Sequence, residues 1–236
     1  MIFSSSEFIF IFFPIVFLGY FILNKLRLIT FSKVWLIFAS LFFYSYWNIN
    51  FLPLILSSIL VNFATSRILI GYANCEKMYF SKKNILVIGI IFNLSLLVYF
   101  KYMDFFINNI NYLSGVNIEL FNYALPLAIS FFTLQQIAFI IDSYENLVKE
   151  RNFINYSLFV TFFPQLIAGP IVHHKEMMPQ FDSLKKKILC KTNLKLGFFI
   201  FSIGLFKKII LADTFGVWSD YGFSTSASLT FFQAWT

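Results

Sequence analysis

The residues of this chain that could carry chemistry are few, and they lie beside or within long apolar stretches. His173 and His174 directly follow an apolar segment and precede Lys175 and Glu176. A histidine near its ordinary pKa can take a proton from a hydroxyl, which makes the pair a candidate base or metal ligand. Adjacent residues point to different sides of a helix, so we expect no metal site here. The favoured interpretation is that both are polar residues at the end of a buried segment.

A second group of polar side chains consists of Gln135, Gln136 and Asp142. The two glutamines lie inside an apolar segment, where an unpaired amide is costly, so they should face other protein or a wet cavity. Asp142 lies near the end of that segment and is either a solvated helix end or a structural polar contact. A proton relay would need further buried acids, which the apolar segments hardly supply.

Two lysines, Lys207 and Lys208, interrupt the second half of another apolar segment. Long basic side chains near the end of a span can snorkel to the interface, and the alternative is that they line a tunnel or contact an anion. The sequence has no phosphate-binding loop, dinucleotide glycine fingerprint or zinc-protease helix motif. The chemistry of common soluble enzymes is therefore not indicated.

The composition places these residues in a membrane. Of 236 residues, 59% are hydrophobic and 12% are charged, and the mean hydropathy is +0.76. A soluble domain carries about 25% charged residues, so this chain cannot cover its surface with polar groups. The net charge of +7 comes from short clusters between apolar runs, which indicates membrane loops and argues against nucleic acid as a partner. We predict an all-α, polytopic membrane bundle whose surface contacts lipid.

Apolar segments divide the chain into elements of about the length that crosses a bilayer. We predict a single transmembrane domain over residues 1–236, with a polar loop at 108–122. The predicted apolar segments are 8–23, 34–47, 51–70, 85–102, 123–141, 153–172 and 194–212.

Loop charges predict the orientation of the bundle. The loops that contain residues 25–33, 67–83 and 175–191 each carry a net charge of +3, whereas residues 101–119 carry −1. Basic loops stay in the cytoplasm, so the N-terminus should lie outside a bacterial cytoplasmic (inner) membrane.

The segment 153–172 conflicts with this orientation if it crosses the membrane, because it would end outside just before a basic loop. The conflict disappears if the segment enters and leaves on the same side. Pro164 and the Gly169-Pro170 pair can break a helix in this way. Irregular backbone at membrane depth is tolerated only beside protein or water, so a re-entrant segment implies a cavity.

Three stretches together form a recognisable pattern. They are Phe162-Phe163-Pro164-Gln165-Leu166-Ile167-Ala168-Gly169-Pro170-Ile171 with Glu176 and Pro179-Gln180, then Leu125–Thr133 with Gln135, Gln136 and Asp142, and Gly204–Lys208 with Ala212-Asp213. The pattern resembles bacterial membrane-bound O-acyltransferases, and within them the alginate O-acetyltransferase type. The resemblance covers essentially the whole chain in the family's order.

The resemblance implies transfer of an acyl group to a hydroxyl through a tunnel in the membrane. It implies no bound cofactor, an acyl donor such as acetyl-CoA or an acyl carrier as co-substrate, and an envelope polysaccharide acceptor such as alginate or peptidoglycan. An extracytoplasmic acetylation partner protein is also implied. The tunnel or motif candidates are Gln135, Gln136, Asp142, Pro164, Gln165, Gly169, Pro170, Lys207 and Lys208.

One departure from the family pattern concerns the catalytic histidine. The family's histidine motifs lie beyond the region that this chain covers, and His173 and His174 stand at positions where the family is variable. We therefore expect the N-terminal half of an enzyme, from a truncated gene or as half of a split enzyme, with no catalytic residue and no activity alone. One alternative is an inactive membrane remnant. Another is a transporter or channel whose broken segment lines a permeation path, although the lack of an internal repeat argues against it.

Overall fold

Helices make up the regular structure of this chain, and no strand occurs in the residues that are described below. The computed structural model describes residues 1–72, 81–122, 124–148, 150–167, 169, 172–183 and 187–224. The chain divides into two units, Val16–Lys187 and Met1–Ile15 with Ile188–Thr236, and each is treated by itself. The predicted all-α class is confirmed.

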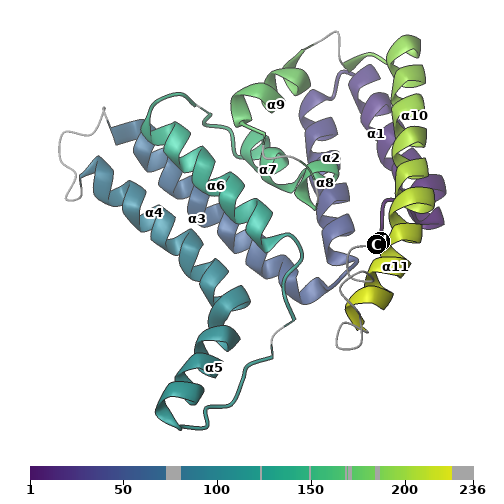
Figure 1. The fold of residues 1–236 in the computed structure, drawn as a ribbon. Coiled ribbons are helices and arrows are strands. Elements are labelled where there is room, and N and C mark those ends of the chain that lie inside the picture. The colour runs from purple at the N-terminus through teal and green to yellow at the C-terminus, as the bar shows by residue number, and fades with distance from the viewer. Residues whose placement is uncertain are drawn as a thin grey trace. The chain divides into compact units, whose positions relative to one another are not determined.

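The larger unit begins within the first long helix and holds most of the elements (Figure 1). These are α1 (Phe13–Lys25), α2 (Ile29–Ser45), η2 (Ile49–Phe51), α3 (Leu52–Gly71), α4 (Lys82–Leu97), η4 (Val98–Tyr102), α5 (Met103–Ser114), α6 (Ile129–Tyr144), α7 (Phe153–Thr161), α8 (Phe163–Leu166) and α9 (His174–Asp182).

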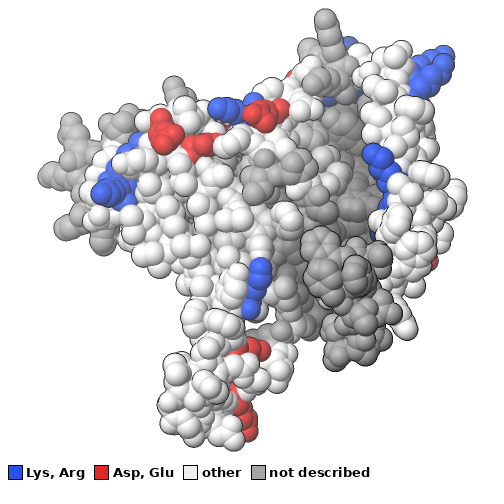
Figure 2. All heavy atoms as spheres, viewed as in Figure 1, with Lys and Arg blue, Asp and Glu red and all other residues white. Residues whose placement is uncertain are grey.

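Three helical stretches among the described residues are long and apolar enough to cross a membrane, namely Phe8–Lys25, Ile49–Gly71 and Lys82–Ser114. A further apolar helix, Ile29–Ser45, is shorter. On the face shown in Figure 2, charged atoms of the larger unit lie along the edge formed by the start of α4, the end of α6 and α9, and again around α5, with a nearly uncharged surface between the two groups. Such a belt matches the hydrocarbon layer of a bilayer.

The packed centre of this unit is formed by α3, α4 and α6, which run side by side (Figure 1). Gly89 of α4 permits a close approach, because a Cβ there would lie 2.9 Å from the Thr65 methyl group of α3. Small residues at helix contacts let two helices pack closely in a membrane. There, van der Waals packing and hydrogen bonds drive helix association in place of the hydrophobic effect.

A buried polar network joins the same three helices. The Asn93 amide donates to Asn62 Oδ1 at 2.6 Å, and the Asn62 amide donates to Asn93 Oδ1 at 3.1 Å and also to Gln136 Oε1. Ser58 Oγ donates to the same Gln136 oxygen at 3.0 Å. Since each group is fully buried, the network fixes the register of the helices.

The structure differs from the sequence prediction at the predicted loop 108–122. The helix α5 continues to Ser114, so the first half of that stretch is helical. Its apolar residues Phe106, Ile107 and Ile110 recur at helical spacing, which outweighs the asparagines between them. Gly115 ends the helix in the left-handed conformation, with φ 67°, and its N–H donates to Asn111 O at 3.0 Å.

The smaller unit contains η1 (Phe8–Phe12) and the helical run α10 (Lys191–Phe206), η6 (Lys207–Ala212) and α11 (Asp213–Ser224). The rings of Phe13 and Phe201 stack within it, with centroids 6.4 Å apart. None of the residues of α10, η6 and α11 is buried, although the run is rich in Phe and Ile. An apolar helix with such exposure suits lipid.

Candidate functional site

The segment 153–172 is broken in the middle, as its sequence predicts. The helix α7 ends at Thr161, Phe162 leaves the helical conformation with ψ 106°, and α8 starts with Pro164 in its first turn. The break leaves the Phe163 N–H without a helical partner, and this group donates to Ser40 Oγ of α2 at 3.1 Å. A side chain thus satisfies the backbone at the interruption, as a low-dielectric environment requires.

Both ends of this segment lie at the same end of the larger unit. At its start, the Asn155 side chain accepts a hydrogen bond from Lys33 Nζ at 2.7 Å, and the same ammonium contacts Asp182 of α9 at 2.8 Å. At its end, His173 Nδ1 lies 3.2 Å from Asp142. Ser40 follows Lys33 by seven residues of α2, so the break lies about 10 Å further along the helix axis. The contacts place the start of the segment and the residue that follows it near one end of the larger unit; that the segment re-enters the membrane stays a prediction.

Gly169 belongs to the returning part of the segment and has no room for a side chain. A Cβ at this position would lie 2.6 Å from Gln165 Cα and 2.8 Å from Gln165 O, both backbone atoms. The Gly169 N–H donates to Gln165 O at 2.9 Å, which closes a tight turn after α8. Pro164 is exposed and Gln165 is half-buried, whereas Pro170 lies outside the described residues.

The two predicted glutamines both contact protein. The Gln135 amide donates to the Phe159 carbonyl of α7 at 3.0 Å, which attaches the broken segment to α6. Gln136 belongs to the network with Asn62, and its Nε2 is buried without a partner. The sequence predicts that these amides face either other protein or a wet cavity. Gln135 Nε2 and Gln136 Oε1 both contact other protein.

The two histidines lie among carboxylates. His174 is 7% exposed and lies between the rings of Phe139 and Phe159, with centroids 5.2 Å away in both cases. Its Nε2 has no hydrogen-bond partner and lies 3.8 Å from a Glu150 oxygen. Burial lowers the pKa of His174 below its ordinary value, and the charges of Glu150, Asp142 and Asp182 oppose this shift.

His174 also lines a shallow groove of about 350 Å³ together with Glu150, Lys175, Met178 and Asp182. Beside this groove, Lys33 joins α2 to α7 through Asn155 and to α9 through Asp182, and Asp142 of α6 contacts His173 directly before α9. No group of three or more possible metal ligands occurs in the part of the chain that the structure describes. The arrangement holds the ends of the broken segment together.

The stability of the protein should depend on His174 as pH falls. Because the pKa of His174 is lowered by folding, the unfolded chain binds the proton more readily. This histidine therefore contributes stability above its unfolded pKa of about 6.5, and the contribution is lost as pH falls from there toward the folded pKa. The thermal midpoint in detergent, measured from pH 7.5 to 5.5, should fall less for His174→Phe than for the native protein.

The other titrating groups that face His174, which are Glu150, Asp142 and Asp182, remain in both proteins, as do the neighbours His173 and Lys175. The difference between the two pH profiles therefore isolates His174. Parallel profiles would contradict a buried neutral histidine.

Replacing Ser40 by alanine should destabilise the protein by about 1–2 kcal/mol, because the buried Phe163 N–H loses its acceptor. Ser57→Ala is the matched control, since the Ser57 hydroxyl is exposed and donates only to Leu54 O in its own helix. Unfolding in mixed detergent measures both. Equal effects of the two substitutions would show that the break does not depend on Ser40.

The lysines of the smaller unit have a local environment. Lys208 Nζ pairs with Asp213 one turn further along the same helical run, and both side chains are half-exposed. Lys207 begins η6 and is exposed. Whether they snorkel or line a tunnel stays a prediction.

Sequence reasoning missed several residues that hold the site. Ser40, Asn62 and Asn93 are polar residues inside apolar runs, and the argument that singled out Gln135 applies equally to them. Lys33 was counted only as a loop charge, although it is 8% exposed and pairs with Asp182.

Long apolar helices, an uncharged belt and a broken segment with its polar groups satisfied by neighbouring helices define a multi-pass membrane protein. The chain belongs to the membrane-bound O-acyltransferase family, whose family model matches residues 41–235. The family resemblance noted in the sequence is thereby confirmed.

Curated relatives refine the comparison. The chain is 45% identical to the peptidoglycan O-acetyltransferase of Helicobacter pylori, over 100% of this chain and 49% of that protein. It is 32% identical to a probable alginate O-acetylase of Pseudomonas syringae pv. tomato, over 95% of this chain and 42% of that protein. The same identity is found with a probable alginate O-acetylase of Azotobacter vinelandii, over 98% and 45%. The chain thus spans about half the length of these relatives. No solved structure matches it.

Proposed function

We propose that the protein containing this chain transfers an acetyl group to hydroxyls of a cell-envelope polysaccharide, with peptidoglycan as the first candidate. The observation that carries this proposal is the 45% identity, over the whole chain, with a peptidoglycan O-acetyltransferase. Identity with the two probable alginate O-acetylases is 32%.

In the proposed reaction, the hydroxyl oxygen of the polysaccharide attacks the acyl carbon of the donor. A base takes the hydroxyl proton, and the donor's carrier group leaves as the ester forms. The donor is acetyl-CoA or an acyl carrier, and an extracytoplasmic partner protein presents the acceptor. His173 and His174 are not assigned as the base, because the family resemblance implies that the histidine motifs lie beyond the region that this chain covers.

This chain would supply the wall of the acyl-transfer tunnel and its re-entrant segment, with Pro164, Gln165 and Gly169 at the innermost turn. We further propose that the N-terminus lies outside the cytoplasmic membrane. The contacts that support this orientation join basic residues at the end of α3 and the start of α4 to neighbouring segments at one end of the larger unit. Arg67 donates to Arg151 O at 2.7 Å, and Lys82 donates to Tyr144 O. Basic ends of this kind stay in the cytoplasm.

Deleting the gene in its own host and measuring ester-linked acetate tests the function. Purified peptidoglycan is treated with mild alkali, and the released acetate is quantified. We expect the acetate to fall to background in the deletion strain and to return with a plasmid copy of the full gene. Unchanged acetate in peptidoglycan, and in any other envelope polysaccharide of the strain, would refute the proposal.

A further inference from the structure

The helical run that ends in α5 is longer than a bilayer is thick. The run Lys82–Ser114 has 33 residues, which rise about 50 Å at 1.5 Å per residue, whereas the hydrocarbon layer measures about 30 Å. It starts at the basic end of the larger unit, where Lys82 donates to Tyr144 O. The last 12 residues, Met103–Ser114 of α5, account for about 18 Å. They therefore lie past the hydrocarbon layer, at the membrane face opposite the basic loops.

The run changes direction before α5 begins. Residues Val98–Tyr102 form the π-helical segment η4, and Figure 1 shows that α5 turns away from the direction of α4 at this point. A π-helical turn within an α-helix is a common cause of a sharp bend. Since α3 and α4 run side by side and are long enough to cross a membrane, a helix that turns away from them can lie along the membrane surface.

One side of α5 is apolar and exposed. Phe106, Ile110 and Leu113 follow one another at intervals of four and three residues, so their side chains form a stripe along the helix. All three are exposed, and the exposed fraction of Leu113 reaches 82%. If this stripe faced the aqueous phase, water would contact three large apolar side chains, which is unfavourable.

The stripe continues the side of the run that faces lipid. Ile91, Leu94, Val98 and Tyr102 precede Phe106 at intervals of three or four residues and are also exposed. Within the span, an exposed apolar side of this kind contacts lipid chains. The same surface passes through η4 onto α5, where the next apolar medium is the boundary between acyl chains and headgroups.

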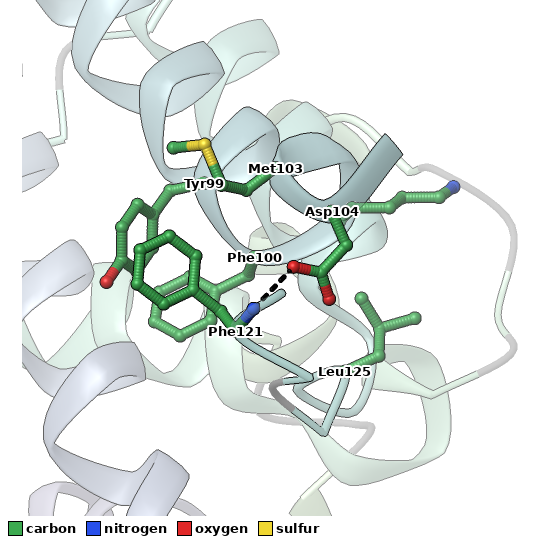
Figure 3. A pocket seen from close by; sticks show the side chains of 7 residues that line it. Tyr99, Phe100, Met103, Asp104, Phe121 and Leu125 are labelled. Carbon is green, nitrogen blue, oxygen red and sulfur yellow. Dashed lines mark hydrogen bonds between the residues drawn. The ribbon is translucent and has the colours of Figure 1, made fainter. Parts of the chain in front are cut away.

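The other side of α5 is polar and holds the loop that follows the helix. Asp104 accepts hydrogen bonds from the N–H groups of Phe121 and Asn122, at 2.9 and 3.0 Å, and Figure 3 shows its carboxylate directed at the Phe121 backbone. Further along the helix, the Asn111 side chain bonds both the N–H and the carbonyl of Ile118, at 2.9 and 2.8 Å. The loop is thus attached away from the stripe and leaves it uncovered.

We propose that α5 is an interfacial helix, whose stripe of Phe106, Ile110 and Leu113 rests in the lipid boundary at the membrane face opposite the basic loops. The attached loop is thereby held at the membrane surface. Lipid fits this stripe better than a protein partner does, because three side chains are far fewer than the roughly 20–30 residues that each side of a stable protein interface contributes. The contact with lipid does not depend on the proposed acetyl transfer.

Spin labels on the two sides of α5 test this contact. The full-length protein, with its native cysteines replaced by serine, receives a single nitroxide-labelled cysteine at Ile110 or Leu113. The matched controls are Asn108 and Tyr112, which are exposed on the other side of the same helix. Each variant is reconstituted into vesicles of phosphatidylethanolamine and phosphatidylglycerol. Power saturation then gives the collision rates with oxygen, which enters lipid, and with a nickel chelate, which stays in water.

The ratio of oxygen to chelate collisions should lie above one at positions 110 and 113 and below one at positions 108 and 112. Ratios below one at all four positions would place α5 in water, and ratios above one at all four would place the whole helix in the hydrocarbon layer. Either result would overturn the proposal. Low collision rates with both reagents at 110 and 113 would also overturn it, because they would show that protein covers the stripe. Elution as a single species in detergent verifies the fold of each variant.

Discussion

Gly169→Ala is expected to destabilise the protein by about 3 kcal/mol and to remove most of the ester-linked acetate that the proposed function predicts in cells. The added Cβ would lie 2.6 and 2.8 Å from the Cα and carbonyl oxygen of Gln165. These are backbone atoms, so no side-chain rotation can relieve the overlap. The tight turn after α8 must open, and the hydrogen bond from the Gly169 N–H to Gln165 O is lost with it.

Gly71→Ala is the matched control for this substitution, because a Cβ at Gly71 contacts nothing within 4 Å. Unfolding in mixed detergent gives the stability of each variant, and ester-linked acetate in the complemented deletion strain gives the activity. Native stability in Gly169→Ala would contradict the close approach between position 169 and the Gln165 backbone. Reduced stability in both variants to the same extent would show a general cost of added methyl groups.

Asn62→Leu is expected to cost about 2–4 kcal/mol, since it unpairs a buried oxygen and adds apolar volume at a packed contact. Asn93 Oδ1 would lose its partner, and Gln136 Oε1 would keep only the hydrogen bond from Ser58. Asn109→Leu is the control, because Asn109 is exposed and donates only to Phe105 O in its own helix.

A double-mutant cycle with Asn93→Leu isolates the coupling within this network. The double variant should lose less stability than the sum of the two single variants, because the second substitution removes a group that is already unpaired. Strict additivity would mean that the two asparagines do not interact in the membrane.

Much of this architecture follows from the sequence by simple physical arguments. Hydropathy and low charge predict the all-α membrane class, which the structure bears out, and loop charge together with Pro164 predicted the break in segment 153–172. The cost of burying an unpaired amide predicted partners for Gln135 and Gln136, and those partners are Phe159, Ser58 and Asn62.

Other features depend on contacts between residues that are distant in the sequence, so the local sequence does not predict them. The polar composition of 108–122 indicates a loop because asparagines are frequent there, whereas the apolar residues of its first half keep helical spacing and form the end of α5. The π-helical segments Val98–Tyr102 and Lys207–Ala212 give no residue-type signal. The partners of Lys33 lie 122 and 149 residues away, so only the fold shows that this loop charge is buried.

The re-entrant path of residues 153–172 is the central structural claim, and cysteine labelling tests it most directly. In a protein with Cys75 and Cys190 replaced by serine, single cysteines are placed at the exposed positions Arg151, Gln180 and Tyr112. A membrane-impermeant maleimide is added to intact and to permeabilised cells. Arg151→Cys and Gln180→Cys should react only after permeabilisation, whereas Tyr112→Cys should react in intact cells. Labelling of positions 151 and 180 from opposite sides would contradict the account.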